Sequence, residues 1–160
     1  MLTPIIIVLI LSSPLAVAFA LANFKIDALD LKKYSCWGLG SAFVFFFIGH
    51  IVEAEGMVTM LPPWIPYRLT LVYLTGLLEL LIAIGLFIPK WQTRAATTAA
   101  VVLVVFFPAN IYAAFNAVGL GGHQWGPSYL LIRAPLQVIL LGWTYFLCIK
   151  TKPIPETRTA

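Results

Sequence analysis

Charged side chains are scarce in this sequence. Aspartate, glutamate, lysine and arginine make up 10% of the 160 residues, whereas they make up about a quarter of a typical soluble domain. A soluble protein this small leaves much of its surface in water and needs charge to cover it, but in a bilayer apolar side chains can face lipid. The composition, 61% apolar with a mean hydropathy of +0.97, therefore excludes an ordinary soluble domain.

Cysteine and histidine are also rare, with two residues of each kind. Cys36 and Cys148 lie far apart in the sequence, at the same predicted end of two helices, so they form neither a CxxC motif nor a disulfide framework. We interpret both as packing residues. His50 and Glu53 lie one helical turn apart and could bind a metal with His123, but two histidines without organised cysteines make a poor site for metal or haem. We therefore predict no metal centre.

Clusters of basic residues are absent as well. The formal net charge of +4 arises from ten basic residues scattered between apolar runs, which is not the basic patch of a nucleic-acid-binding protein. The expected partner of this surface is the lipid bilayer. No P-loop, GxGxxG, HExxH or GxSxG motif occurs either.

The sequence does contain five long apolar segments. About 20 apolar helical residues are needed to cross about 30 Å of hydrocarbon, and five segments approach that length. We therefore predict an all-α, polytopic transmembrane bundle, with an N-terminal transmembrane helix in residues 1–22, a four-helix core in 34–150 and a tail in 151–160. The predicted spans are Thr3 to Ala22, Tyr34 to Ala54, Thr70 to Ile88, Ala95 to Phe115 and Ser128 to Ile149.

One connection, residues 57–68, differs from the other loops. It is too rich in proline for a helix throughout and too apolar for an ordinary aqueous loop. Trp64 and Tyr67 are residue types that favour the level of the lipid headgroups. We predict that this segment lies in the outer membrane interface and covers the polar residues described below.

The basic residues predict the orientation, because lysine and arginine are retained on the cytoplasmic side. With five spans and an outside N-terminus, only Arg68 falls in an outside loop. The predicted orientation is therefore N-terminus outside and C-terminus in the cytoplasm of a bacterial inner membrane. The eight basic residues then placed inside are Lys25, Lys32, Lys33, Lys90, Arg94, Lys150, Lys152 and Arg158.

An alternative reading of the first span is a cleaved signal peptide. The tripeptides Ala16-Val17-Ala18 and Ala18-Phe19-Ala20 resemble signal-peptidase sites, and cleavage would invert every later loop. The N-terminus lacks the basic region of a signal peptide, and inversion would place the basic loops outside. Both facts favour an uncleaved helix.

Five polar residues fall inside the predicted spans. Inserting an ionisable group into hydrocarbon costs about 2.5 to 3.5 kcal/mol of free energy, so each such residue needs a partner or a functional role. At a rise of 1.5 Å per residue, three of them lie about 6 to 8 Å from the outer helix ends and two lie about 14 Å deep. The residues are His50, Asn110 and Arg133 in the shallow tier, with Glu79 and Gln137 in the deep tier.

Helical faces indicate how these residues meet. Arg133 and Gln137 share one stripe, and Glu79 lies in a stripe with Gly76 and Ala83 whose small side chains allow close helix approach. We predict an ion pair between Glu79 and Arg133, extended by the two amides. A buried network that only locks the helices in register is the structural alternative.

Four ordered motifs resemble those of the DoxX and DoxX-like family of small bacterial membrane proteins. The resemblance covers about residues 34–150 and implies a four-helix core; the extra N-terminal span departs from the family pattern. Glu79, Asn110, Arg133 and Gln137 match family positions, and His50 matches less securely. The motifs are Pro63-Trp64-Ile65-Pro66, Gly76-Leu77-Leu78-Glu79, Phe107-Pro108-Ala109-Asn110-Ile111 and Arg133-Ala134-Pro135-Leu136-Gln137.

The resemblance implies a first function, because some family members are subunits of a thiosulfate:quinone oxidoreductase and others associate with oxidative-stress enzymes. The first hypothesis is a small membrane subunit of a quinone-linked oxidoreductase, whose polar residues bind a quinone while a redox partner supplies electrons. The second is a non-catalytic scaffold with a structural polar network. A permease is disfavoured, because five spans show no inverted repeat. The sequence alone does not decide whether the chain is an enzyme.

Overall fold

The computed structural model describes residues 2–22, 30–116 and 123–152, and these residues form helices without any strand. The elements are α1 (Leu2–Ala22), α2 (Leu31–Val52), α3 (Ala54–Thr59), α4 (Arg68–Phe87), α5 (Gln92–Phe115), the 3-10 helix η1 (His123–Tyr129), α6 (Leu130–Trp143) and the π-helical segment η2 (Thr144–Lys150).

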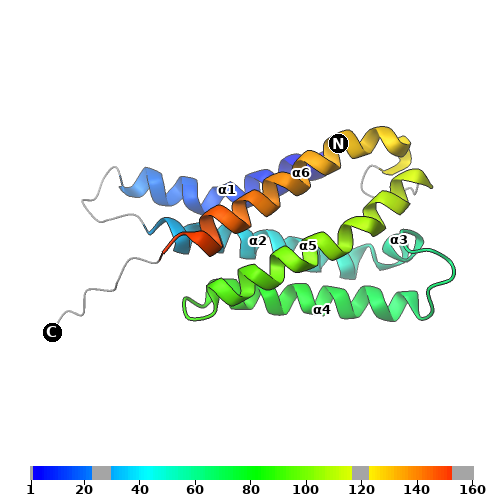
Figure 1. Cartoon of the computed structure of the whole chain (residues 1–160), viewed down its shortest axis with the longest axis horizontal. Helices are drawn as coiled ribbons and strands as arrows, with labels where there is room; N and C mark the ends of the chain where they lie inside the picture. The colour runs from blue at the N-terminus through cyan, green and yellow to red at the C-terminus, as the bar shows by residue number, and fades with distance from the viewer. Residues whose placement is uncertain (1, 23–29, 117–122, 153–160) are drawn as a thin grey trace.

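Among the described residues, five helical stretches are long and apolar enough to cross a bilayer: α1, α2, α4, α5 and the stretch Trp125–Lys150 that contains α6 and η2. Successive long helices run in alternating directions along one bundle (Figure 1). The predicted all-α bundle of five spans is therefore confirmed, and the chain is a multi-pass membrane protein. One boundary differs because Asp30 caps α2: its side chain accepts a 3.0 Å hydrogen bond from the Lys33 amide, so the helix begins at Leu31 rather than Tyr34.

Glycines set how closely the helices approach. A Cβ atom on Gly76 of α4 would lie 2.7 Å from His50 Cβ of α2, and one on Gly85 of α4 would lie 2.9 Å from Ala95 Cβ of α5. A Cβ on Gly38 of α2 would collide with the Leu11 carbonyl of α1. Such close approach gives dispersion contacts between helices that lipid cannot supply. The glycines thus hold α1, α2, α4 and α5 together around an apolar core.

The two ends of the bundle differ in charge. α2 and α5 begin, and α4 and η2 end, at one end of the bundle, which we name the basic end (Figure 1). The opposite end carries α3 and the start of α4, and we name it the α3 end; Arg68 lies there. Lys25 and Arg158 lie outside the described residues. The basic residues at or beside the basic end are Lys32, Lys33, Lys90, Arg94, Lys150 and Lys152.

The segment predicted at the interface begins inside α3, which ends at Thr59. Beyond it the chain turns without a helix until Arg68, and Tyr67 takes a left-handed conformation (φ 52°). Trp64 and Tyr67 are 80% and 84% exposed, so neither packs into the core. The placement of this segment at the level of the lipid headgroups stays a prediction.

Candidate functional site

The five polar residues singled out in the spans come from four different helices. His50 lies in the last turn of α2, Glu79 in α4, Asn110 in α5, and Arg133 and Gln137 in α6. Glu79, Asn110 and Gln137 are each at least nine-tenths buried. These residues divide into two groups, one between α2 and α4 and the other between α5 and α6.

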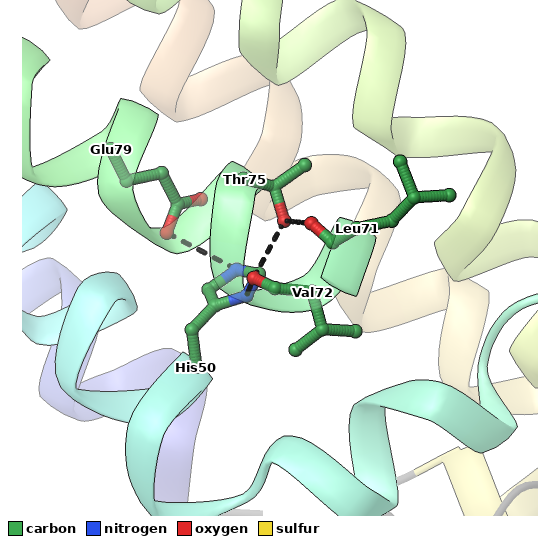
Figure 2. Close-up of polar contacts among 5 residues, drawn as sticks. All are labelled: His50, Leu71, Val72, Thr75 and Glu79. Carbon is green, nitrogen blue, oxygen red and sulfur yellow. Dashed lines mark hydrogen bonds and ion pairs between the residues drawn. The ribbon is translucent and has the colours of Figure 1, made fainter. Parts of the chain in front are cut away.

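The first group is an ion-pair contact between His50 and Glu79. His50 Nε2 lies 3.3 Å from Glu79 Oε2. Figure 2 shows the two side chains pointing toward each other. The contact depends on Gly76, one turn before Glu79, because any larger side chain there would meet the His50 side chain. The stripe of small residues beside Glu79 therefore admits an imidazole from the neighbouring helix.

The hydrogen bonds of His50 determine how many protons the pair holds. Its Nδ1 lies 2.8 Å from the Val72 carbonyl oxygen, which also accepts from the Thr75 hydroxyl at 3.0 Å (Figure 2). A carbonyl only accepts, so Nδ1 carries a hydrogen. If Nε2 were then bare and Glu79 ionised, a lone pair would face a carboxylate. Besides the hydrogen on Nδ1, the pair therefore holds one shared proton, as imidazolium with carboxylate or as imidazole with carboxylic acid.

Glu79 also has an unused acceptor. Apart from the 3.3 Å contact of Oε2 with His50 Nε2, which is not aligned as a hydrogen bond, this enclosed oxygen has no donor among the described residues. A buried oxygen without a donor loses its hydration without compensation. Glu79 can therefore accept a hydrogen bond from a bound molecule.

The second group is formed by Arg133 and Asn110. Arg133 Nε donates to Asn110 Oδ1 at 3.1 Å, and Asn110 Nδ2 donates to the Phe106 carbonyl at 3.1 Å. An arginine carries five N–H donors, so this bond uses only one of them. The amide orients the guanidinium but does not neutralise it.

The predicted ion pair between Glu79 and Arg133 is wrong. Within residues 2–22, 30–116 and 123–152, no salt bridge joins Arg133 to a carboxylate, and Glu79 contacts His50 instead. Arg133 and Glu79 still interact electrostatically at longer range. The reason is packing: α2 approaches α4 closely at Gly76, whereas α6 packs against α5 rather than α4.

Gln137 performs a structural task. Its Nε2 donates a 2.6 Å hydrogen bond to the Leu103 carbonyl of α5. Leu103 precedes Val104, whose carbonyl loses its helical donor because Pro108 has no N–H. Gln137 therefore joins α6 to the proline-disturbed part of α5, and this bond uses one of its two amide N–H donors.

No metal site emerges from the residues that the structure describes, since no three His, Cys, Asp or Glu side chains gather there. Glu53 is exposed, and the His123 side chain lies outside the described set. Sequence reasoning also missed Val72 and Thr75. The spacing of Thr75 and Gly76 before Glu79 is the signal that could have indicated a polar, closely packed turn.

Comparison with known protein families gives one match in this region. The model of a family described as a domain of unknown function (DUF8561) matches residues 39–148, which include all five polar residues. No curated protein and no solved structure matches the chain.

Proposed function

Because this chain belongs to the DUF8561 family, whose activity its description leaves open, we propose from the site that it is a small membrane subunit of a quinone-linked oxidoreductase, similar to DoxX proteins. The polar residues near the α3 end would bind the quinone head group. Two observations carry the proposal. The half-buried Arg133 guanidinium uses only one N–H donor in the hydrogen bonds found among the described residues, and the buried Glu79 Oε2 has no aligned donor there.

The donors and acceptors of a quinone suit this pair of groups. A quinone carbonyl accepts hydrogen bonds, which fits Arg133, and a quinol hydroxyl donates one, which fits Glu79 Oε2. Asn110 and Gln137 each already donate to a backbone carbonyl, so Arg133 is the principal donor. A bound quinone supplies two-electron, two-proton chemistry, and the electrons come from a partner subunit.

The His50–Glu79 pair would handle the proton. It holds one proton in either of two forms, so it can donate to a ligand oxygen or accept from it while Val72 and Thr75 keep the imidazole in place. Both groups lie where bulk water is scarce, and a pair that moves one proton locally avoids creating an isolated charge. This gives His50 and Glu79 a role that Arg133 cannot fill.

The second candidate function is a scaffold whose polar network is structural. Its support is that each of the five side chains already makes at least one contact within the protein. Solvent extraction of the purified protein, followed by absorbance and mass spectrometry, separates the two functions. The quinone-linked function predicts a retained quinone; a purified, folded protein that neither retains nor takes up quinone would support the scaffold.

The proposed orientation puts the basic end in the cytoplasm of a bacterial inner membrane and the polar cluster in the outer half of the bundle. The lopsided distribution of lysine and arginine supports it. A reporter enzyme that is active only outside the cytoplasm should be silent when fused after Ala160. The same reporter inserted after Trp64, near the α3 end, should be active. The reverse pattern would contradict the orientation.

A further inference from the structure

A pair of thiols meets near the basic end of the bundle, away from the polar cluster. Cys36 of α2 and Cys148 of η2 are both free and fully buried. Both side chains belong to the same buried core cluster, where they interact with each other. Both are packing residues, as predicted, and the fold brings them into one buried cluster.

The fold brings these thiols together through two neighbouring elements. The Trp143 indole N–H donates a 3.0 Å hydrogen bond to the carbonyl of Ser35, the residue before Cys36. η2 packs against α2, and its π-helical turn buries Thr144 and Cys148 while Tyr145 remains exposed. Segments of π-helix often occur at functional sites. The two cysteines therefore lie at an interface between α2 and η2 that is packed and joined by a hydrogen bond.

A buried ammonium group lies beside the thiols. Lys32, one helical turn before Cys36, is only 6% exposed, and its Nζ donates to Thr93 Oγ1 at 2.9 Å. No salt bridge to a carboxylate accompanies it in the part of the chain that the structure describes. Lys32 interacts electrostatically with Cys148. Burial of the two neighbouring thiols disfavours a thiolate, the reactive form of cysteine, and the Lys32 charge opposes that effect in part.

We propose that Cys36 and Cys148 are a redox-active dithiol, which a small neutral oxidant of the hydroperoxide class converts into a disulfide between α2 and η2. Burial of both thiols selects an oxidant that is small and uncharged enough to enter the bundle. Along α2 the pair lies about 20 Å from His50, so this site is independent of the proposed quinone site.

The reaction balances without another reactant. One thiolate attacks a peroxide oxygen, the O–O bond breaks, and the departing hydroxide takes up the proton released by that thiol, which gives a sulfenic acid and water. The second thiol attacks the sulfenic sulfur, the S–S bond forms, and the departing hydroxide takes the second proton as water. The two sulfur atoms together lose two electrons, and the peroxide oxygens gain them.

Intact mass and thiol counting on the full-length protein test this proposal. The protein in liposomes is treated with hydrogen peroxide, quenched, unfolded and alkylated with a maleimide. We expect both thiols to disappear together in a chain lighter by two hydrogen atoms, with no link between chains. Two alkylatable thiols after treatment, oxidation without a disulfide, or a disulfide that joins two chains would each overturn the proposal.

Two variants test the role of the ammonium. Lys32→Met should slow disulfide formation by about tenfold, which corresponds to a small change in activation free energy. Lys33→Met is the matched control, because the Lys33 ammonium lies over the Tyr34 and Trp37 rings instead, and its rate should equal the wild-type rate. Equal rates in both variants would remove Lys32 from the proposal. The wild-type mass measurement tests the dithiol even if Lys32→Met does not fold.

Discussion

Replacing His50 by leucine is expected to destabilise the folded protein by about 3 kcal/mol, because it strands the Glu79 carboxyl group in the bundle. Glu79→Leu should cost less, since the remaining imidazole can stay neutral while Nδ1 still donates to Val72. Replacing both by leucine should cost less than the sum of the two single changes. Unfolding of each variant in detergent measures these differences.

The double-mutant cycle also distinguishes which helix supplies the partner of Glu79. A coupling free energy of about 1 to 3 kcal/mol is expected between His50 and Glu79, because they are in contact. The coupling between Glu79 and Arg133 should be smaller, because they interact only at longer range. Glu55→Leu, at an exposed position of α3, is the control and should change stability little. Additive losses at His50 and Glu79, or a larger coupling to Arg133, would refute this arrangement.

Arg133→Met is expected to have the largest effect on ligand binding. The change preserves much of the side-chain length but removes every N–H donor of the guanidinium. A hydrogen bond from a charged group contributes about 1.5 to 3 kcal/mol, which corresponds to a loss of quinone affinity of about 10- to 100-fold. The fold should tolerate the change better than His50→Leu, because Arg133 has no contacting carboxylate within the described residues, although its loss strands Asn110 Oδ1.

A matched control for Arg133→Met lies near the same end of the bundle. Arg68 is the first residue of α4, and its Nη1 donates a long 3.5 Å hydrogen bond to the Leu61 carbonyl. Arg68→Met removes the same charge from the chain without touching the polar cluster. Its quinone affinity should equal that of the wild type, so an equal loss in both variants would indicate a general effect of charge.

The five spans could be predicted from the sequence because membrane crossing is set by the length and polarity of each segment alone. The polar residues could also be singled out one by one, since each is rare in such a segment. Their pairing could not be predicted. Depth and helical face place Glu79 opposite several helices, and only the close approach at Gly76 assigns it to His50 rather than Arg133.

The thiol pair was missed for a related reason. Cys36 and Cys148 are at opposite ends of the sequence, and nothing local connects them. Their contact depends on the packing of η2 on α2 and on a π-helical turn, which departs from the 3.6-residue period used to assign faces from sequence. Gln137 illustrates a further limit: its residue type indicates a hydrogen bond, but only the fold shows that the acceptor is the Leu103 carbonyl.

Ligand-induced stabilisation tests the central claim, that the polar cluster binds a quinone head group, most directly. A ligand at 100 times its Kd stabilises the folded state by about 2.7 kcal/mol, which raises the midpoint of thermal unfolding. Wild type, Arg133→Met and Arg68→Met are compared in detergent with and without a saturating quinone. We expect quinone to raise the Tm of the wild type and of Arg68→Met. The rise should be absent or much smaller for Arg133→Met. No rise in any of the three proteins, or an equal rise in all three, would contradict it.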